Sequence, residues 1–84
     1  MKAVVEKYLA PLRIEHAAKC KDISCGIWSE AGRVELHFSY TPHTSGKPLT
    51  EIVWMPAAGA TTAREREAFV AAAMATFSET LGRV

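Results

Sequence analysis

The sequence contains only two cysteines, Cys20 and Cys25, and no CxxC pair. Two cysteines in a chain without secretory features indicate reduced thiols rather than a disulfide framework. No apolar run approaches the ~20 residues that a membrane-spanning helix needs. The opening segment MKAVVEKYLAPL is interrupted by Glu6 and Lys7, so it lacks the apolar centre of a signal peptide. These absences predict a cytoplasmic protein with no membrane partner.

An excess of charge of either sign is also missing. Ten Lys and Arg residues nearly balance nine Asp and Glu residues, which leaves a formal net charge of +1. Nucleic-acid-binding domains usually carry a basic excess, so the balance argues against nucleic acid as a partner. With 49% apolar and 23% charged residues, the composition is that of a globular domain. A chain of 84 residues is expected to form a single domain, residues 1–84.

The stretch from Asp22 to Tyr40 carries the strongest pattern in the sequence. Residues alternate with a period of two on both sides of the turn Glu30-Ala31-Gly32-Arg33, which predicts a hairpin of two strands, residues 22–29 and 33–40. A loop with an even number of residues puts all the regular apolar positions on one side of the sheet, whereas an odd number mixes apolar and polar residues on both sides. We therefore expect the even register, which pairs Ser29 with Val34, Ile27 with Leu36, Cys25 with Phe38 and Ile23 with Tyr40.

A third strand is predicted over residues 50–55, between a loop rich in turn-forming residues and Pro56. Ile52 and Trp54 point to one side of this strand, and Glu51 points to the other. Because burying Glu51 without a partner is expensive, Ile52 and Trp54 are expected to face the core. This register sets Leu36 opposite Trp54, Phe38 opposite Ile52 and His37 opposite Val53.

The side of the sheet that faces away from this core is the candidate binding surface. In the expected registers it carries Trp28, His37, Val53 and Met55. This grouping exceeds the scattered apolar exposure of an ordinary polar face, and tryptophan is over-represented among residues that dominate interfaces. The sequence leaves open whether the first helix covers this face. In that case the four residues would belong to a core between two helical layers.

Two helices are predicted to flank the strands. Residues 2–20 have an amphipathic pattern, and Pro11 within it costs on the order of 3 kcal/mol, so a kink or a break is expected there. A strand over residues 13–20 is the alternative, since Ile14, His16, Ala18 and Cys20 also alternate. The closing helix, residues 62–81, starts with the capping box Thr62-Ala63-Arg64-Glu65, is rich in alanine and stops before Gly82.

The predicted fold class is α+β, in the order α-β-β-β-α, with a three-stranded antiparallel meander packed by two helices. In its size, its composition and its alanine-rich closing helix over residues 62–81, the chain resembles small beta-proteobacterial proteins of unknown function. The resemblance covers the whole length. It implies a bacterial protein and assigns a role to no residue.

No set of residues converges on a catalytic or metal-binding pattern, so we predict no catalytic residue, no cofactor and no metal. His16 and Cys20, four residues apart, supply at most two of the three or four ligands of a zinc site. Cys25 points into the expected core, and Cys20 lies near a helix C-terminus, where the dipole opposes a thiolate. Ser45-Gly46-Lys47 lacks the first glycine of a phosphate-binding loop, and Pro48 stands where Ser or Thr would bind magnesium.

The leading hypothesis is a non-enzymatic interaction module that binds a protein partner or itself through Trp28, His37, Val53 and Met55. The first alternative is a small-molecule or enzymatic site, which predicts a pocket holding at least two of His16, His37 and His43. The second is shape-based RNA binding, because the element order is similar to that of double-stranded-RNA-binding domains. That family relies on a basic cluster at the start of its last helix. Here the matching stretch, Arg64-Glu65-Arg66-Glu67, has charges that cancel.

Overall fold

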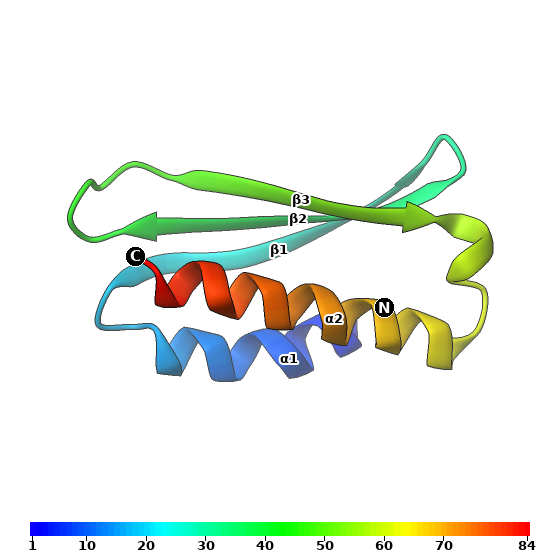
Figure 1. Ribbon diagram of the computed structural model, residues 1–84, viewed down its shortest axis with the longest axis horizontal. Helices are drawn as coiled ribbons and strands as arrows, with labels where there is room; N and C mark the ends of the chain where they lie inside the picture. Colours follow the sequence, from blue (N-terminus) through cyan, green and yellow to red (C-terminus); the bar gives the residue numbers. More distant parts are fainter.

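Three antiparallel strands form one sheet in the order β1-β2-β3, and two helices lie against it in the computed structural model, which describes residues 1–84 (Figure 1). The elements are α1 (Lys2–Glu15), β1 (Cys20–Glu30), β2 (Arg33–Pro42), β3 (Leu49–Pro56), the short 3-10 helix η1 (Ala57–Gly59) and α2 (Ala63–Gly82). The predicted α+β class and the α-β-β-β-α order are confirmed. Neither helix combines the length and the apolar character that crossing a bilayer requires.

Both helices lie on the same side of the sheet and run in the same direction (Figure 1). Lys7 of α1 pairs with Glu67 of α2 at 3.5 Å. At the other end of the helix pair, Nε2 of His16 lies 3.3 Å from Oγ of Ser78. The helices therefore form a single layer, and no helix lies on the opposite face of the sheet.

The core fills the space between this helical layer and the inner face of the sheet. Alternation along β2 turns Val34, Leu36, Phe38 and Tyr40 toward the helices, and all four are buried. Phe38 stacks on Phe77 of α2, with ring centroids 4.5 Å apart. Thirteen buried residues from α1, β1, β2 and α2 form one continuous cluster. Each large apolar side chain in it contributes about 1.5–3 kcal/mol through burial.

The hairpin of β1 and β2 has the predicted even register next to its turn. The two loop residues, Ala31 and Gly32, have φ of 52° and 74°. A two-residue loop with positive φ at both positions matches the right-handed twist of the strands. The confirmed pairs are Ser29 with Val34, Ile27 with Leu36 and Cys25 with Phe38.

Farther from the turn, where Ile23 is predicted to pair with Tyr40, the ladder is irregular and Asp22 and Ile23 together face Tyr40. The register shifts between Lys21 and Ser24, and Asp22 in this irregular stretch has φ of 55°. A bulge of this kind bends one strand and leaves a residue unpaired. Ile23 is nevertheless buried, as its apolar character predicts.

The predicted register of β3 is wrong by one residue. Leu36 pairs with Val53 and Phe38 with Glu51, so Glu51 and Val53 point toward the helices. The prediction depended on the cost of burying Glu51 without a partner. In the fold, the hydroxyl of Thr80 in α2 donates to Oε2 of Glu51 at 3.3 Å, so one oxygen of the carboxylate has a partner on the inner side, while Oε1 is buried without one.

The first helix is shorter than predicted, and the alternative strand over residues 13–20 is wrong as well. α1 continues through Pro11 and ends at Glu15, after which the backbone N–H of His16 donates to the carbonyl oxygen of Leu12 at 3.0 Å and that of Ala17 donates to the carbonyl oxygen of Ile14 at 3.4 Å. β1 begins at Cys20. The segment in which both periodicities fit is thus divided between the end of the helix, a turn and the first residue of the strand.

The closing helix begins as predicted. Oγ1 of Thr62 accepts the backbone N–H of Glu65 at 3.1 Å, and Oε1 of Glu65 accepts the backbone N–H of Thr62 at 3.0 Å. This reciprocal capping box satisfies two backbone donors that the helix itself leaves free. It fixes the start of α2 relative to η1 and the end of β3.

Threonine substitutions at two neighbouring residues of β3 test the corrected register. Val53→Thr places a hydroxyl against the core and is expected to lower the free energy of unfolding by about 1–3 kcal/mol. Ile52→Thr alters a half-exposed side chain and is expected to change that free energy by less than about 0.5 kcal/mol. Urea unfolding followed by circular dichroism measures both values. The opposite order of the two effects would restore the register expected from the sequence.

Candidate interaction surface

The face of the sheet that is turned away from the helices, here called the outer face, carries two tryptophans on either side of a carboxylate. Trp28 of β1 and Trp54 of β3 both pair across the sheet with Glu35 of the central strand β2. In the next row, His37 lies between Gly26 and Ile52. Trp28, Ile52 and Trp54 are 54%, 53% and 52% exposed. The outer face is therefore an apolar surface with a polar centre.

Five side chains form an unbroken series of contacts across all three strands. The ring of Trp28 lies against the ring of His37, with centroids 5.2 Å apart. Nε2 of His37 lies 2.8 Å from Oε1 of Glu35, at hydrogen-bond distance. Oε2 of Glu35 lies 2.8 Å from Nε of Arg33 in an ion pair, and the guanidinium of Arg33 lies over the ring of Trp54, 4.8 Å from its centroid. These contacts hold both tryptophans without help from a helix.

Glu35 is a buried carboxylate on a face that no helix covers. It is only 7% exposed and lies between its two tryptophan neighbours. The hydrogen bond with His37, reinforced by the charge of Arg33, lowers the pKa of Glu35 below its ordinary value of 4.5. Glu35 is therefore ionised at neutral pH, with one partner at each oxygen. A carboxylate in such a place needs these partners, because a buried charge without them is strongly unfavourable.

Two of the four residues that the sequence assigned to the binding surface lie on the outer face. Trp28 and His37 are on the outer face and touch each other. Val53 and Met55 are on the helix-facing side of β3 instead, because the register of that strand differs by one residue from the predicted one. Val53 packs against the core.

Sequence reasoning missed Ile52 and Trp54, which it assigned to the core, and it gave no role to Arg33. A signal for the polar centre was present. Arg33, Glu35 and His37 are spaced two residues apart, so one strand presents all three on the same face. A carboxylate between two basic side chains at this spacing indicates an ion pair along the strand.

The three histidines lie apart and have different partners. His37 contacts Glu35, His16 lies beside Ser78 of α2, and Nε2 of His43 lies 2.9 Å from the carbonyl oxygen of Ala17. A pocket of about 370 Å³ lies at the start of β1, and His43 is the only histidine that lines it. The pocket that a histidine-based site predicts, with at least two histidines, is not formed.

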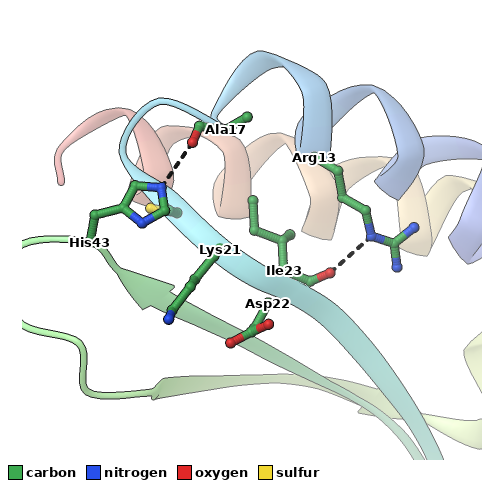
Figure 2. Close-up of a pocket in the computed structure, with 7 residues that line it drawn as sticks. Arg13, Ala17, Lys21, Asp22, Ile23 and His43 are labelled. Atoms are coloured by element: carbon green, nitrogen blue, oxygen red, sulfur yellow. Dashed lines mark hydrogen bonds between the residues drawn. The ribbon is translucent and has the colours of Figure 1, made fainter.

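The polar side chains around this pocket do not converge on its centre (Figure 2). Nε of Arg13 donates to the carbonyl oxygen of Ile23 at 3.0 Å, and the rest of its guanidinium binds Glu6. Figure 2 shows Lys21 and Asp22 extending away from Arg13. A catalytic site needs several groups within reach of one reacting atom, and this pocket lacks such an arrangement.

Neither cysteine is an activated thiol. Burial raises the pKa of Cys20. Burial, together with the charge of Glu6, raises the pKa of Cys25 to about 11. Because the thiolate is the nucleophilic form, both side chains remain weakly reactive thiols at neutral pH. Cys20 also lies in β1 rather than on the same helical face as His16, and no group of three or more His, Cys, Asp or Glu side chains is placed to hold a metal ion.

The charged stretch at the start of α2 is largely engaged within the chain. Glu65 caps the helix. Arg66 donates to the carbonyl oxygen of Thr61 at 2.9 Å, and Glu67 pairs with Lys7. Three of the four side chains in this stretch therefore already bind groups of the protein itself.

No protein-family model, curated protein or solved structure matches the chain significantly. Any role of the outer face must therefore be inferred from its own chemistry.

The substitution Glu35→Gln tests the polar centre of the outer face through its pH dependence. The folded-state pKa of Glu35 lies below its ordinary value of 4.5. Its ionised form therefore stabilises the fold fully above that ordinary value, and the stabilisation is lost as the pH falls through the lowered pKa. We expect the variant to be less stable than the wild type at pH 7, with a difference that shrinks on acidification. Urea unfolding between pH 3 and pH 7 measures this difference.

Glu30→Gln is the matched control, since Glu30 is an exposed carboxylate on the same hairpin. It is expected to change the free energy of unfolding little at any pH. A stability difference for Glu35→Gln that stays constant from pH 7 to pH 3 would contradict the assignment of an ionised, bonded Glu35.

Proposed function

We propose that this protein is a non-enzymatic interaction module whose outer face binds an apolar surface of a partner protein. One observation carries the proposal: two half-exposed tryptophans are held on an uncovered sheet face by the Arg33–Glu35–His37 group. Solvent-exposed apolar groupings of this kind on a folded protein mark interaction sites. Its composition and its two free thiols, Cys20 and Cys25, suit action in the bacterial cytoplasm.

The charges of the outer face favour an apolar partner over a charged one. Glu35 binds both Arg33 and His37, so the carboxylate and the guanidinium neutralise each other within the face. A ligand such as nucleic acid needs cations that are free to contact phosphates. The guanidinium of Arg33 instead lies between Glu35 and the ring of Trp54. The groups that remain available are therefore the aromatic surfaces and Ile52.

The contacts between these side chains also lower the cost of binding. Ordering a mobile side chain at an interface costs about 0.5–1.5 kcal/mol. Trp28 lies against His37 and Trp54 lies against Arg33, and both of these neighbours contact Glu35. The tryptophan side chains are therefore partly ordered in the folded protein before binding, which reduces the ordering cost at the interface. Tryptophan is enriched among the residues at the energetic centre of interfaces, and the outer face presents two of them.

Site-specific photo-crosslinking tests the outer face as a binding surface. A benzoylphenylalanine at position 28, on the outer face, is expected to form an adduct with a second protein when the chain is expressed in its native cells. The same residue at position 72, an exposed site on α2, is the control and is expected to form none. Adding Trp54→Ser to the position-28 variant should reduce the adduct at least about fivefold, because truncating an interface tryptophan typically costs more than about 1 kcal/mol.

Three results would count against the proposal. They are adducts from position 72 alone, no adduct from position 28, and an adduct that is unaffected by Trp54→Ser. An adduct with the mass of two copies of the chain would identify the partner as a second copy packed face to face. Thermal unfolding of each variant checks that the fold is retained.

A further inference from the structure

The two edge strands of the sheet differ in how well their free edges are protected. β1 and β3 are both edges, since the strand order is β1-β2-β3. An exposed edge presents unpaired N–H and C=O groups that can pair with another chain. Folded proteins block such edges with bulges, charged side chains, prolines or a covering element. In this protein the features that block pairing are concentrated on the edge formed by β1.

β1 carries several of these devices. Its ladder is interrupted by the irregularity between Lys21 and Ser24, and the charged side chains of Lys21 and Asp22 lie there. Nε of Arg13 in α1 donates to the carbonyl oxygen of Ile23 at 3.0 Å. A second strand could therefore not add along the whole of β1 without breaking existing contacts.

β3 is open by comparison. The run Leu49–Met55 is paired regularly with β2, has no bulge and contains no proline. No hydrogen bond from outside the sheet reaches its backbone. Its one charged side chain, Glu51, points inward and accepts a hydrogen bond from Thr80. Three of the five large exposed apolar residues of the protein, Leu49, Ile52 and Trp54, are on this strand.

We infer that β3 pairs with β3 of a second copy, so that two three-stranded sheets join into one six-stranded sheet. A strand that pairs with its own copy about a two-fold axis is antiparallel, as every pair in this sheet already is. Charge also permits the pairing. Registers centred on Ile52 or on Val53 place Glu51 opposite Val53 or Met55, and never opposite the second Glu51.

Association stops at two copies because the only strand edges left free in the dimer are the two protected β1 edges. Joining β3 to β3 leaves one copy of β1 at each end of the six-stranded sheet. The bulge and the charges of β1 oppose further addition, so a dimer is expected rather than a fibre. The two-fold axis is perpendicular to the sheet, so the outer faces of both copies lie on the same side of the six-stranded sheet.

The dimer brings the outer face to the size of an ordinary binding surface. A three-stranded face eight residues long has an area of about 400 Å², from strand spacings of about 4.8 Å and a rise of about 3.4 Å per residue. Stable specific interfaces bury about 800 Å² per partner. One copy thus offers about half of this area, and the six-stranded sheet offers all of it. The pairing through β3 is nevertheless independent of what the outer face binds.

Sedimentation velocity of the purified protein, at concentrations up to about 1 mM, tests the inference. The wild type is expected to form a dimer. Ile52→Lys places a charge on the free edge near the two-fold axis and should raise the dissociation constant at least about tenfold, because like charges across paired strands are destabilising. Thr50→Lys is a second variant at an exposed site on the same strand and should act in the same direction. Hydrogen exchange should show backbone amides of β3, and not of β1, becoming slower as the dimer forms.

Trp28→Lys is the matched control, because Trp28 has nearly the same exposure as Ile52 but lies on β1. It should leave the dimer unchanged. A protein that is monomeric at every concentration would overturn the inference. So would a dimer that Trp28→Lys dissociates and Ile52→Lys does not, since that result indicates face-to-face packing. A dimer that survives all three substitutions would also overturn it. Circular dichroism of each variant verifies the fold.

Discussion

The stacking of Phe38 on Phe77 determines which side of the sheet the helices occupy, and the rest of the structure depends on it. β2 is the central strand, and its residues alternate strictly between the two faces. Once Phe38 and its apolar neighbours are buried under α2, Glu35 and His37 must lie on the opposite side. The chemistry of the outer face is therefore a direct consequence of how the core is packed. A helix on each side would have required an apolar outer face on β2, and the sequence of that strand does not provide one.

A charged residue in the middle of an uncovered sheet could simply be hydrated, but Glu35 is not. Its position between Trp28 and Trp54 removes most of its contact with water. Its two oxygens are satisfied by Arg33 and His37 instead. The same two basic side chains then contact the tryptophans. The polar group and the apolar group thus stabilise each other, and this mutual dependence gives the outer face a defined shape.

The sequence predicts the parts of this fold in which only one pattern is possible. The hairpin register follows from alternation on both arms and a glycine at the turn, and the start of α2 follows from a four-residue capping motif. β3 is different, because both of its faces carry apolar residues and only Glu51 distinguishes them. The partner that makes the inward position of Glu51 acceptable is Thr80, 29 residues away in α2. No local pattern reveals such a contact, so the register, and with it half of the predicted site, could not be obtained from local periodicity.

The same error explains why the most exposed strand was expected to be a core strand. Ile52 and Trp54 resemble core residues because both are large and apolar, although each is about half exposed on the outer face. The inner residues of β3 are already packed by the domain itself, so an apolar residue on its outer side is not needed for folding. Evolution usually places lysine or proline on such an edge to prevent pairing, and β1 has comparable protection from its bulge and charges. β3 therefore combines an open edge over Leu49–Met55 with two half-exposed apolar side chains, Ile52 and Trp54, on its outer side.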